Sequence, residues 1–204
     1  MSAKRILWSI DMSYHQLIYK MKANGHGLMS LNQYLAVAQK LDELAPCNFL
    51  VFGLGHDAYI WNEINEGGKT VFLEDDAEWT SKFNDSGLEI FSVKYDTKAA
   101  DHEKIGFDEA KLKMDLPKAV TDVSWDMIFV DGPLSHNPPR PYKGPGRMKS
   151  IYAAYSLLKD KGICAMDDMG RLIESTYAYH FFGKENLIFG KLVENKIGIF
   201  TKNS

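Results

Sequence analysis

Short apolar runs that alternate with helical patterns constrain the fold of this chain more than any other feature. The five runs are residues 48–52, 70–73, 88–93, 126–130 and 163–166. Several of them do not alternate apolar with polar residues as a half-exposed strand does, and this lack of alternation is typical of strands buried on both faces. Helical patterns precede, separate or follow them, at 30–44, at 57–66, from 148 to near 162, and through Ile173, Tyr177 and His180. Alternating β and α units produce a mostly parallel sheet with helices on both faces.

The last part of the chain follows a different pattern. Two β-prone runs, 187–193 and 196–201, are separated only by Glu194 and Asn195, which is hairpin spacing. The sequence therefore predicts an α/β fold, a Rossmann-like three-layer sandwich whose seven-stranded, mostly parallel sheet ends in an antiparallel hairpin. This is the layout of class I methyltransferases, whereas a nicotinamide-binding Rossmann fold usually continues with further parallel units.

Length, charge and cysteine content limit the class of protein. A chain of 204 residues usually makes one domain, and we expect a domain at 30–204 preceded by an N-terminal extension at 1–29. The net charge of −3 argues against a sequence-independent grip on nucleic acid, which requires a strongly basic face. Cys47 and Cys164 lie in or beside apolar runs and fit no metal motif, so we expect two buried thiols. No apolar run approaches the ~20 residues of a membrane span, so the sequence as written predicts a soluble, cytoplasmic protein.

A glycine pair and an acidic residue predict a nucleoside cofactor at the carboxyl edge of the sheet. Gly53, Leu54, Gly55 and His56 follow the first run of the alternating series, where glycines let the backbone approach a ligand closely. Glu74, 19 residues after Gly55, ends the next run and is followed by Asp75; a carboxylate at about this spacing suits a ribose diol. The glycines also fit a tight strand-to-helix turn, and Gly53-x-Gly55-x-x-Ala58 fits a nicotinamide fingerprint, so spacing alone does not choose the cofactor.

The sequence around these positions resembles the plant glucuronoxylan 4-O-methyltransferase family of xylan synthesis. The blocks that carry the resemblance are residues 45–57, 67–74, 125–133 and 145–148, with weaker matches at Asp168 and Arg171. The resemblance covers residue 30 to the end. It implies that a methyl group passes from S-adenosylmethionine to the 4-hydroxyl of glucuronic acid in glucuronoxylan or a related acidic glycan.

The chain departs from the family pattern in three places. Family members carry an N-terminal Golgi membrane anchor that the sequence as written lacks, so the resemblance implies the Golgi lumen if this is the anchor-free part of such a protein. Asp167 precedes Asp168 where the family tends to have His, and the loop 134–144 looks longer and more basic than usual.

Carboxylates at two strand tips are the candidate catalytic groups. A sugar hydroxyl is a poor nucleophile, so a base or a metal ion should assist it. Asp131 follows the fourth run together with Gly132, and Asp167 and Asp168 follow the fifth. Asp131, Asp167 and Asp168 could hold a divalent cation, or crowding could raise the pKa of one carboxylate and make it a general base. Alternatively, Asp167 caps the next helix, and Asp131 and Gly132 contact the cofactor.

The loop after the fourth run concentrates basic residues beside this edge. Arg140, Lys143 and Arg147 are candidate contacts for a uronate carboxylate, because the planar guanidinium matches carboxylate geometry. Tyr142 could stack on a sugar face, and His136 is a further candidate base. The alternative interpretation is that these side chains belong to a solvated surface loop and have no role in binding or catalysis.

Two other functions remain open at this stage. One is a small NAD(P)-dependent oxidoreductase, although the sequence lacks a Tyr-x-x-x-Lys pair after the fourth run. The other is a non-catalytic protein of polysaccharide assembly, since the family that the chain resembles includes such candidates. An acidic polysaccharide is the expected partner of the leading function.

Overall fold

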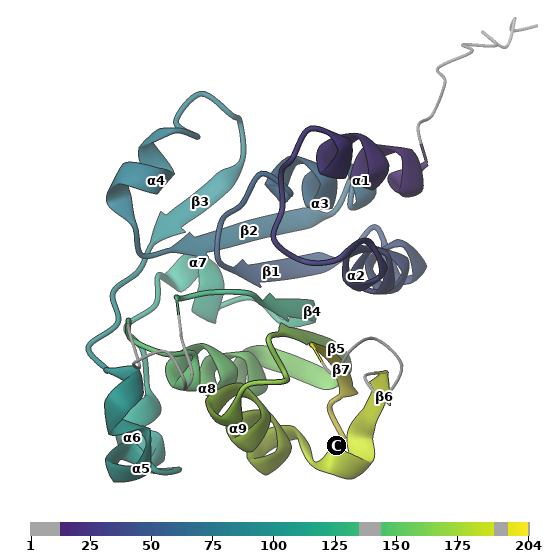
Figure 1. Cartoon of the computed structure of the whole chain (residues 1–204). Helices are drawn as coiled ribbons and strands as arrows, with labels where there is room; N and C mark the ends of the chain where they lie inside the picture. Colours follow the sequence, from purple (N-terminus) through teal and green to yellow (C-terminus); the bar gives the residue numbers. More distant parts are fainter. Residues whose placement is uncertain (1–12, 135–143, 190–195, 204) are drawn as a thin grey trace, which may run out of the picture.

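The computed structural model describes residues 13–134, 144–189 and 196–203, and its strands form one sheet in the order β3-β2-β1-β4-β5-β7-β6 (Figure 1). The strands are β1 (Asn48–Phe52), β2 (Lys69–Glu74), β3 (Glu89–Ser92), β4 (Trp125–Val130), β5 (Leu158–Asp167), β6 (Leu187–Phe189) and β7 (Ile197–Thr201). Strands β1 to β5 pair in parallel, and β7 lies antiparallel between β5 and β6. The predicted seven-stranded sheet with an antiparallel end is confirmed.

Each face of the sheet carries its own apolar core. In β1, Leu50 and Phe52 point to one face while Phe49 and Val51 point to the other, and all four are buried. The first face packs against α8 (Met148–Leu157) and α9 (Leu172–Phe182), and the second against α1 (Tyr14–Ala23), α2 (Leu31–Leu44) and α3 (Ala58–Ile64). Figure 1 shows the two helical layers on opposite sides of the strands. The molecule is therefore the predicted three-layer sandwich.

The described part of the predicted N-terminal extension packs on the domain. Ile18, Met21 and Met29 are buried in the same core as α2 and α3. The Nζ of Lys22 donates to the carbonyls of Gly27 and Met29, at 2.9 and 2.8 Å, which holds the link from α1 to α2. Residues 13–29 thus contribute to the core.

The boundary between α8 and β5 was predicted wrongly. The periodicity suggested a helix that ends near Gly162 and a strand from 163, but α8 ends at Leu157 and β5 begins at Leu158. Leu158 pairs with Trp125 and Ile163 pairs with Met127, so four intervening residues stand opposite one and form an irregularity in the ladder. Sequence periodicity does not register such a bulge, because it depends on the partner strand.

Several short helices had no recognisable pattern in the sequence. They are α4 (Ala77–Ser81), η1 (Ala99–Asp101), α5 (His102–Ile105), α6 (Glu109–Leu112), α7 (Lys118–Thr121) and η2 (Lys184–Asn186). Each spans five residues or fewer, too short for helical periodicity to emerge. The predicted hairpin residues Glu194 and Asn195 lie outside the described residues.

Two further expectations concern cysteines and membranes. Cys47 and Cys164 are both free and buried, as predicted. Within the described ranges, none of the helices has the length and apolar character needed to cross a bilayer.

Candidate active site

The carboxyl ends of β1 and β4 meet where the strand order reverses, which is where open α/β sheets bind ligands. Gly53 follows β1 with φ of +109°, a conformation that disfavours any side chain. A Cβ on Gly53 would lie 3.1 Å from the backbone nitrogen of Gly132, and one on Gly132 would lie 2.9 Å from the Cα of Gly53. Two backbone segments therefore touch at this point, because each glycine leaves the room that the backbone of the other occupies.

Glu74 lies at the end of β2, and its carboxylate binds the turn formed by residues 53–55, called the glycine turn below; this contact is the clasp of Glu74. Its Oε2 accepts from the backbone N–H of Leu54 at 2.9 Å, and its Oε1 accepts from the N–H groups of Asp75 and Asp76 at 3.0 and 2.9 Å. A carboxylate offers about four lone-pair positions, so one position on Oε2 stays available to a ligand hydroxyl. Burial raises the pKa of Glu74, whereas the three N–H donors favour its ionised form.

Aromatic rings cover the outer side of the same turn. The imidazole of His56 stacks on His26 with ring centroids 4.2 Å apart, and Trp79 meets His56 edge-on at 5.4 Å. The indole N–H of Trp79 donates to the carbonyl of Leu54 at 2.5 Å. His56 was predicted to contact the cofactor; the structure places it on the surface of the turn, between residues from the chain before α2 and from α4.

Three carboxylates, of which Asp57 and Asp167 are buried and Asp131 is partly exposed, converge on the edge from three elements. Asp57 precedes α3, Asp131 follows β4, and Asp167 ends β5. Burial raises the pKa of Asp57 to about 6, and the negative charge of Asp167 adds to that rise. Burial also raises the pKa of Asp131 well above its ordinary value, opposed by Arg147 and reinforced by Asp167 and Asp57. The pKa of Asp167 is raised by burial and by Asp168. The cluster is therefore a site that favours a bound proton.

Arg147 is buried next to these carboxylates and neutralises part of their charge. It is 5% exposed; its Nε donates to the carbonyl of Pro133 at 3.2 Å, and its Nη1 to the carbonyl of Asp167 at 3.1 Å. Its Nη2 lies 3.4 Å from Oδ1 of Asp131 and 3.0 Å from Oδ2 of Asp168. We predicted that Arg147 binds a substrate carboxylate. The structure gives this role no direct support, because the buried guanidinium already contacts two carboxylates and two carbonyls of the protein, and the role stays a prediction.

The predicted metal site at Asp131, Asp167 and Asp168 is also not supported. Within the described ranges, no group of three or more His, Cys, Asp or Glu side chains is arranged to hold a metal ion. The physical reason is Arg147, whose guanidinium supplies the positive charge between Asp131 and Asp168 that a cation would otherwise provide.

Asp168 adopts a left-handed backbone conformation, with φ of 62°. Its Oδ2 lies 3.0 Å from Nη2 of Arg147 and 2.9 Å from Nη1 of Arg171, so one oxygen is shared by two guanidinium groups. Such a backbone conformation in a non-glycine residue costs roughly 1–3 kcal/mol and tends to occur at functional sites. The turn after β5 thus places Asp168 where it holds Arg147.

Four predicted residues fall in the part of the chain that the structure does not describe. His136, Arg140, Tyr142 and Lys143 lie within 135–143, outside the described residues. Their predicted roles as base, carboxylate contacts and sugar platform stay predictions.

Sequence reasoning missed Gln33, Tyr34 and Asp57 as site residues. Gln33 donates from Nε2 to Oδ1 of Asp167 at 2.9 Å, and the negative charges of Asp57, Asp131 and Asp167 contribute to the raised pKa of Tyr34. Gln33 is also the third residue of the capping box of α2, a local role that explains a glutamine at this position, so nothing in its spacing pointed to the site. Asp57 stood beside the glycine turn, and its position at the helix start was the one available signal.

We expect Asp57→Asn to stabilise the protein at pH 8 by up to about 3 kcal/mol and to have little effect near pH 4. A carboxyl whose pKa rises from 3.8 to about 6 on folding contributes stability below its unfolded pKa and loses it as pH rises through the folded value. An amide does not ionise, so it avoids that loss. Urea unfolding at the two pH values measures the difference, and an equal change at both would contradict the assignment.

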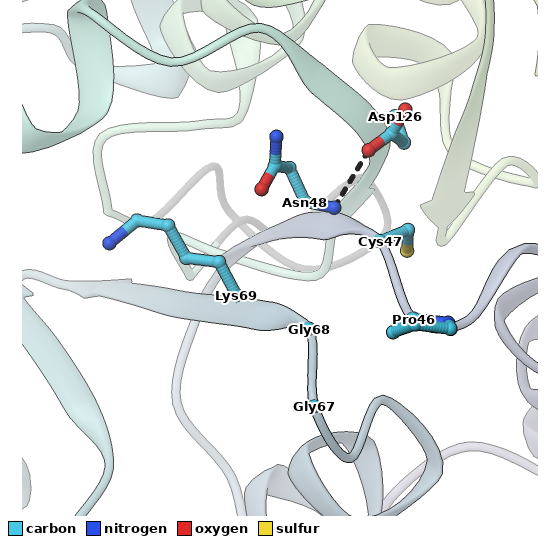
Figure 2. A pocket seen from close by; sticks show the side chains of 7 residues that line it. All are labelled: Pro46, Cys47, Asn48, Gly67, Gly68, Lys69 and Asp126. Carbon is cyan, nitrogen blue, oxygen red and sulfur yellow. Dashed lines mark hydrogen bonds between the residues drawn. The ribbon is translucent and has the colours of Figure 1, made fainter.

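A separate hollow lies at the opposite, amino edge of the sheet (Figure 2). It is lined by Pro46, Cys47, Asn48, Gly67, Gly68, Lys69 and Asp126. Asp126 accepts from the backbone N–H of Asn48 at 2.7 Å, the dashed line in Figure 2. The residues that line this hollow lie at the starts of β1, β2 and β4, whereas the candidate site lies at the strand ends, so the hollow does not belong to that site.

Comparison with known proteins establishes the family. A family model described as IRX15/IRX15L/GXM matches residues 33–106 and 101–194. The chain belongs to the IRX15/IRX15L/GXM family. It is similar to glucuronoxylan 4-O-methyltransferase 3 of Arabidopsis thaliana, 32% identical over 192 residues that cover 82% of this chain and 63% of the relative. It is likewise similar to protein IRREGULAR XYLEM 15 of the same plant, 34% identical over 200 residues that cover 84% of this chain and 61% of the relative. The chain thus spans less than two thirds of the length of these relatives.

Solved structures support the fold. A methyltransferase from Pyrococcus furiosus superposes with a TM-score of 0.52 at 16% identity, covering 92% of this chain and 96% of that one. An S-adenosylmethionine-dependent O-methyltransferase from Thermotoga maritima superposes with a TM-score of 0.51 at 14% identity, covering 94% and 72%. This member of the IRX15/IRX15L/GXM family therefore has the class I methyltransferase fold.

Proposed function

We propose that this protein is an S-adenosylmethionine-dependent O-methyltransferase that acts on the 4-hydroxyl of glucuronic acid in glucuronoxylan or a related acidic glycan. The observation that carries the proposal is one sheet edge at which Glu74, hydrogen-bonded to Leu54 after β1, lies near the carboxylates Asp57, Asp131 and Asp167. The relative named glucuronoxylan 4-O-methyltransferase supports the reaction and the acceptor.

The residues at the β1 and β2 tips fit an adenosyl cofactor. The backbone at Gly53 and Gly132 carries no side chain at this sheet edge, and Glu74 retains a lone-pair position for a ribose hydroxyl. Leu54, Gly55 and Asp75 would line the same pocket. When bound, S-adenosylmethionine supplies an activated methyl group on a sulfonium centre.

The carboxylate cluster fits the proton chemistry that O-methylation needs. As the acceptor oxygen forms its bond to the methyl carbon, the hydroxyl proton must leave. In our proposal Asp131 accepts this proton, because its raised pKa makes its carboxylate a stronger base than an ordinary aspartate. Arg147 and Asp168 hold Asp131 in place. Because only the ionised carboxylate accepts a proton, methyl transfer should fall as pH drops through the raised pKa of Asp131.

The acceptor side rests on predicted contacts. With Arg147 engaged by the protein, recognition of the uronate carboxylate falls in this proposal to Arg140 and Lys143. Tyr142 would offer a face to the sugar ring, and His136 is a second candidate for the proton acceptor.

A non-catalytic role in polysaccharide assembly is the second candidate function. The relative IRREGULAR XYLEM 15 favours it, because its name states no reaction while its identity to this chain is similar. An NAD(P)-dependent reductase is disfavoured, because β7 runs antiparallel beside β5, where a dinucleotide-binding Rossmann sheet continues with a parallel strand.

Two measurements test the proposal. Calorimetry should detect binding of S-adenosylmethionine and none of NADH. A methylation assay on glucuronic-acid-bearing xylo-oligosaccharides should give the 4-O-methyl product, while the neutral xylo-oligosaccharide should not react. Binding of the cofactor without transfer to any uronate-bearing glycan would favour the assembly role, and absence of cofactor binding would refute the proposal.

A further inference from the structure

Gln33 connects the start of α2 to the carboxylate cluster. Its Oε1 accepts from the backbone N–H of Ser30 at 2.8 Å, and its Nε2 donates to Oδ1 of Asp167 at 2.9 Å. The side chain is 3% exposed, and the bond to Asp167 joins residues 134 positions apart in the sequence. One buried amide therefore completes a helix cap and binds an acid of the site at the same time.

The capping box does not require this second contact. Ser30 and Gln33 satisfy each other's N–H groups, since the hydroxyl of Ser30 also accepts from the backbone N–H of Gln33 at 3.4 Å. Glu serves as well as Gln at this position of a capping box. The Nε2 donor is therefore used for Asp167 and is not needed for the helix.

We propose that Gln33 is a positioning residue that holds Asp167 through Oδ1 and so sets the orientation of the carboxylate that faces Asp131. This inference rests on the proposed function, because it concerns the acid cluster assigned there to proton transfer. The carbonyl of Asp167 is held separately by Nη1 of Arg147, so backbone and side chain of this residue are fixed from α8 and α2 respectively.

The charges around Asp167 make a neutral donor at this point consequential. Four ionisable groups besides the adjacent Asp168 face it: Asp57 before α3, Asp131 after β4, Arg147 before α8 and Tyr34 on α2. Three of the surrounding groups are carboxyls, and Arg147 is the cation among these five. A donated hydrogen bond favours the ionised form of an acid, so loss of the Gln33 amide should shift protons towards Asp167.

The first variant, Gln33→Glu, keeps the capping acceptor and replaces the donor by a carboxyl. We expect kcat to fall at least about tenfold near pH 8, the loss of one hydrogen bond to a charged group, with the dissociation constant of S-adenosylmethionine kept within twofold. The loss should shrink towards pH 5.5, because a protonated carboxyl can donate to Asp167 again. Gln33→Met removes the donor without adding a charge and should lower kcat with no such recovery at low pH.

Ser30→Ala is the matched control, because it removes one half of the capping box and leaves the Nε2 bond to Asp167. It should lower the melting temperature while the pH profile of kcat stays that of the wild type. A profile for Gln33→Glu that parallels the wild type, or that matches Ser30→Ala, would make Gln33 a helix cap alone and overturn the inference.

A titration of the Asp167 carboxyl by ¹³C NMR tests the inference without any activity. The pKa of Asp167 should be higher in Gln33→Met than in the wild type and unchanged in Ser30→Ala. An unchanged pKa in Gln33→Met would refute the positioning role even in an active enzyme. If the wild type transfers no methyl group while this pKa shifts as expected, the proposed function fails and the contact between Gln33 and Asp167 stands.

Discussion

Asp131→Asn is expected to lower kcat for methyl transfer by about 10²–10⁴-fold, the usual contribution of a general base. The amide has nearly the same shape as the carboxylate but does not take up a proton from the acceptor hydroxyl. Binding of S-adenosylmethionine should change little, because the ribose contact belongs to Glu74. Initial rates on the glucuronic-acid-bearing oligosaccharide, measured at saturating cofactor from pH 5 to 9, provide the test.

Asp126→Asn is the control on the same strand. Asp126 lies at the amino edge of the sheet, where it accepts from Asn48 and forms an ion pair with Lys159, so its loss should affect stability and leave kcat unchanged. The acid limb of the pH profile should be present in this control and absent from Asp131→Asn. If Asp131→Asn keeps kcat within twofold of the wild type, another group accepts the proton, and His136 becomes the next candidate.

Glu74→Ala is expected to weaken binding of S-adenosylmethionine by about 10–150-fold, which corresponds to 1.5–3 kcal/mol for hydrogen bonds to a charged group. The change removes the proposed ribose acceptor, and it also frees the N–H groups of Leu54, Asp75 and Asp76 that the carboxylate now binds. The glycine turn thereby loses the clasp that holds its conformation. Isothermal titration calorimetry measures the dissociation constant directly.

Glu78→Ala provides the matched comparison. Glu78 is an exposed acid in the first turn of α4, four residues further along the chain. Removing it changes the net charge by the same amount near the same strand tip, so it controls for long-range attraction of the cationic sulfonium. If the dissociation constant of Glu74→Ala is no higher than that of Glu78→Ala, Glu74 is excluded from the cofactor site.

The sheet and its two apolar faces could be predicted because their signals are local. A strand such as β1 buries both of its faces, so its sequence is apolar throughout, and the helices that follow show apolar residues at helical spacing. The position of Glu74 near residues 53–55 follows from the same order, because β1 and β2 pair in parallel and their ends meet. The position of β5 could not be predicted to the residue, because its bulge depends on the register with β4.

The chain by itself determined that a parallel sheet would form and that Gly53, Glu74, Asp131 and Asp167 would stand at its carboxyl edge, since strand order and strand ends follow from periodicity along the sequence. Only the tertiary structure decided the partners of the charged groups there. Arg147 was a reasonable substrate contact from its charge and its place in the sequence, yet packing buries it among Asp131, Asp168 and two carbonyls. Gln33 binds Asp167, a residue 134 positions away in the sequence. A buried charge is costly unless it is paired. Which side chains pair depends on which ones the packed layers bring together in space, and local sequence patterns carry no information about that.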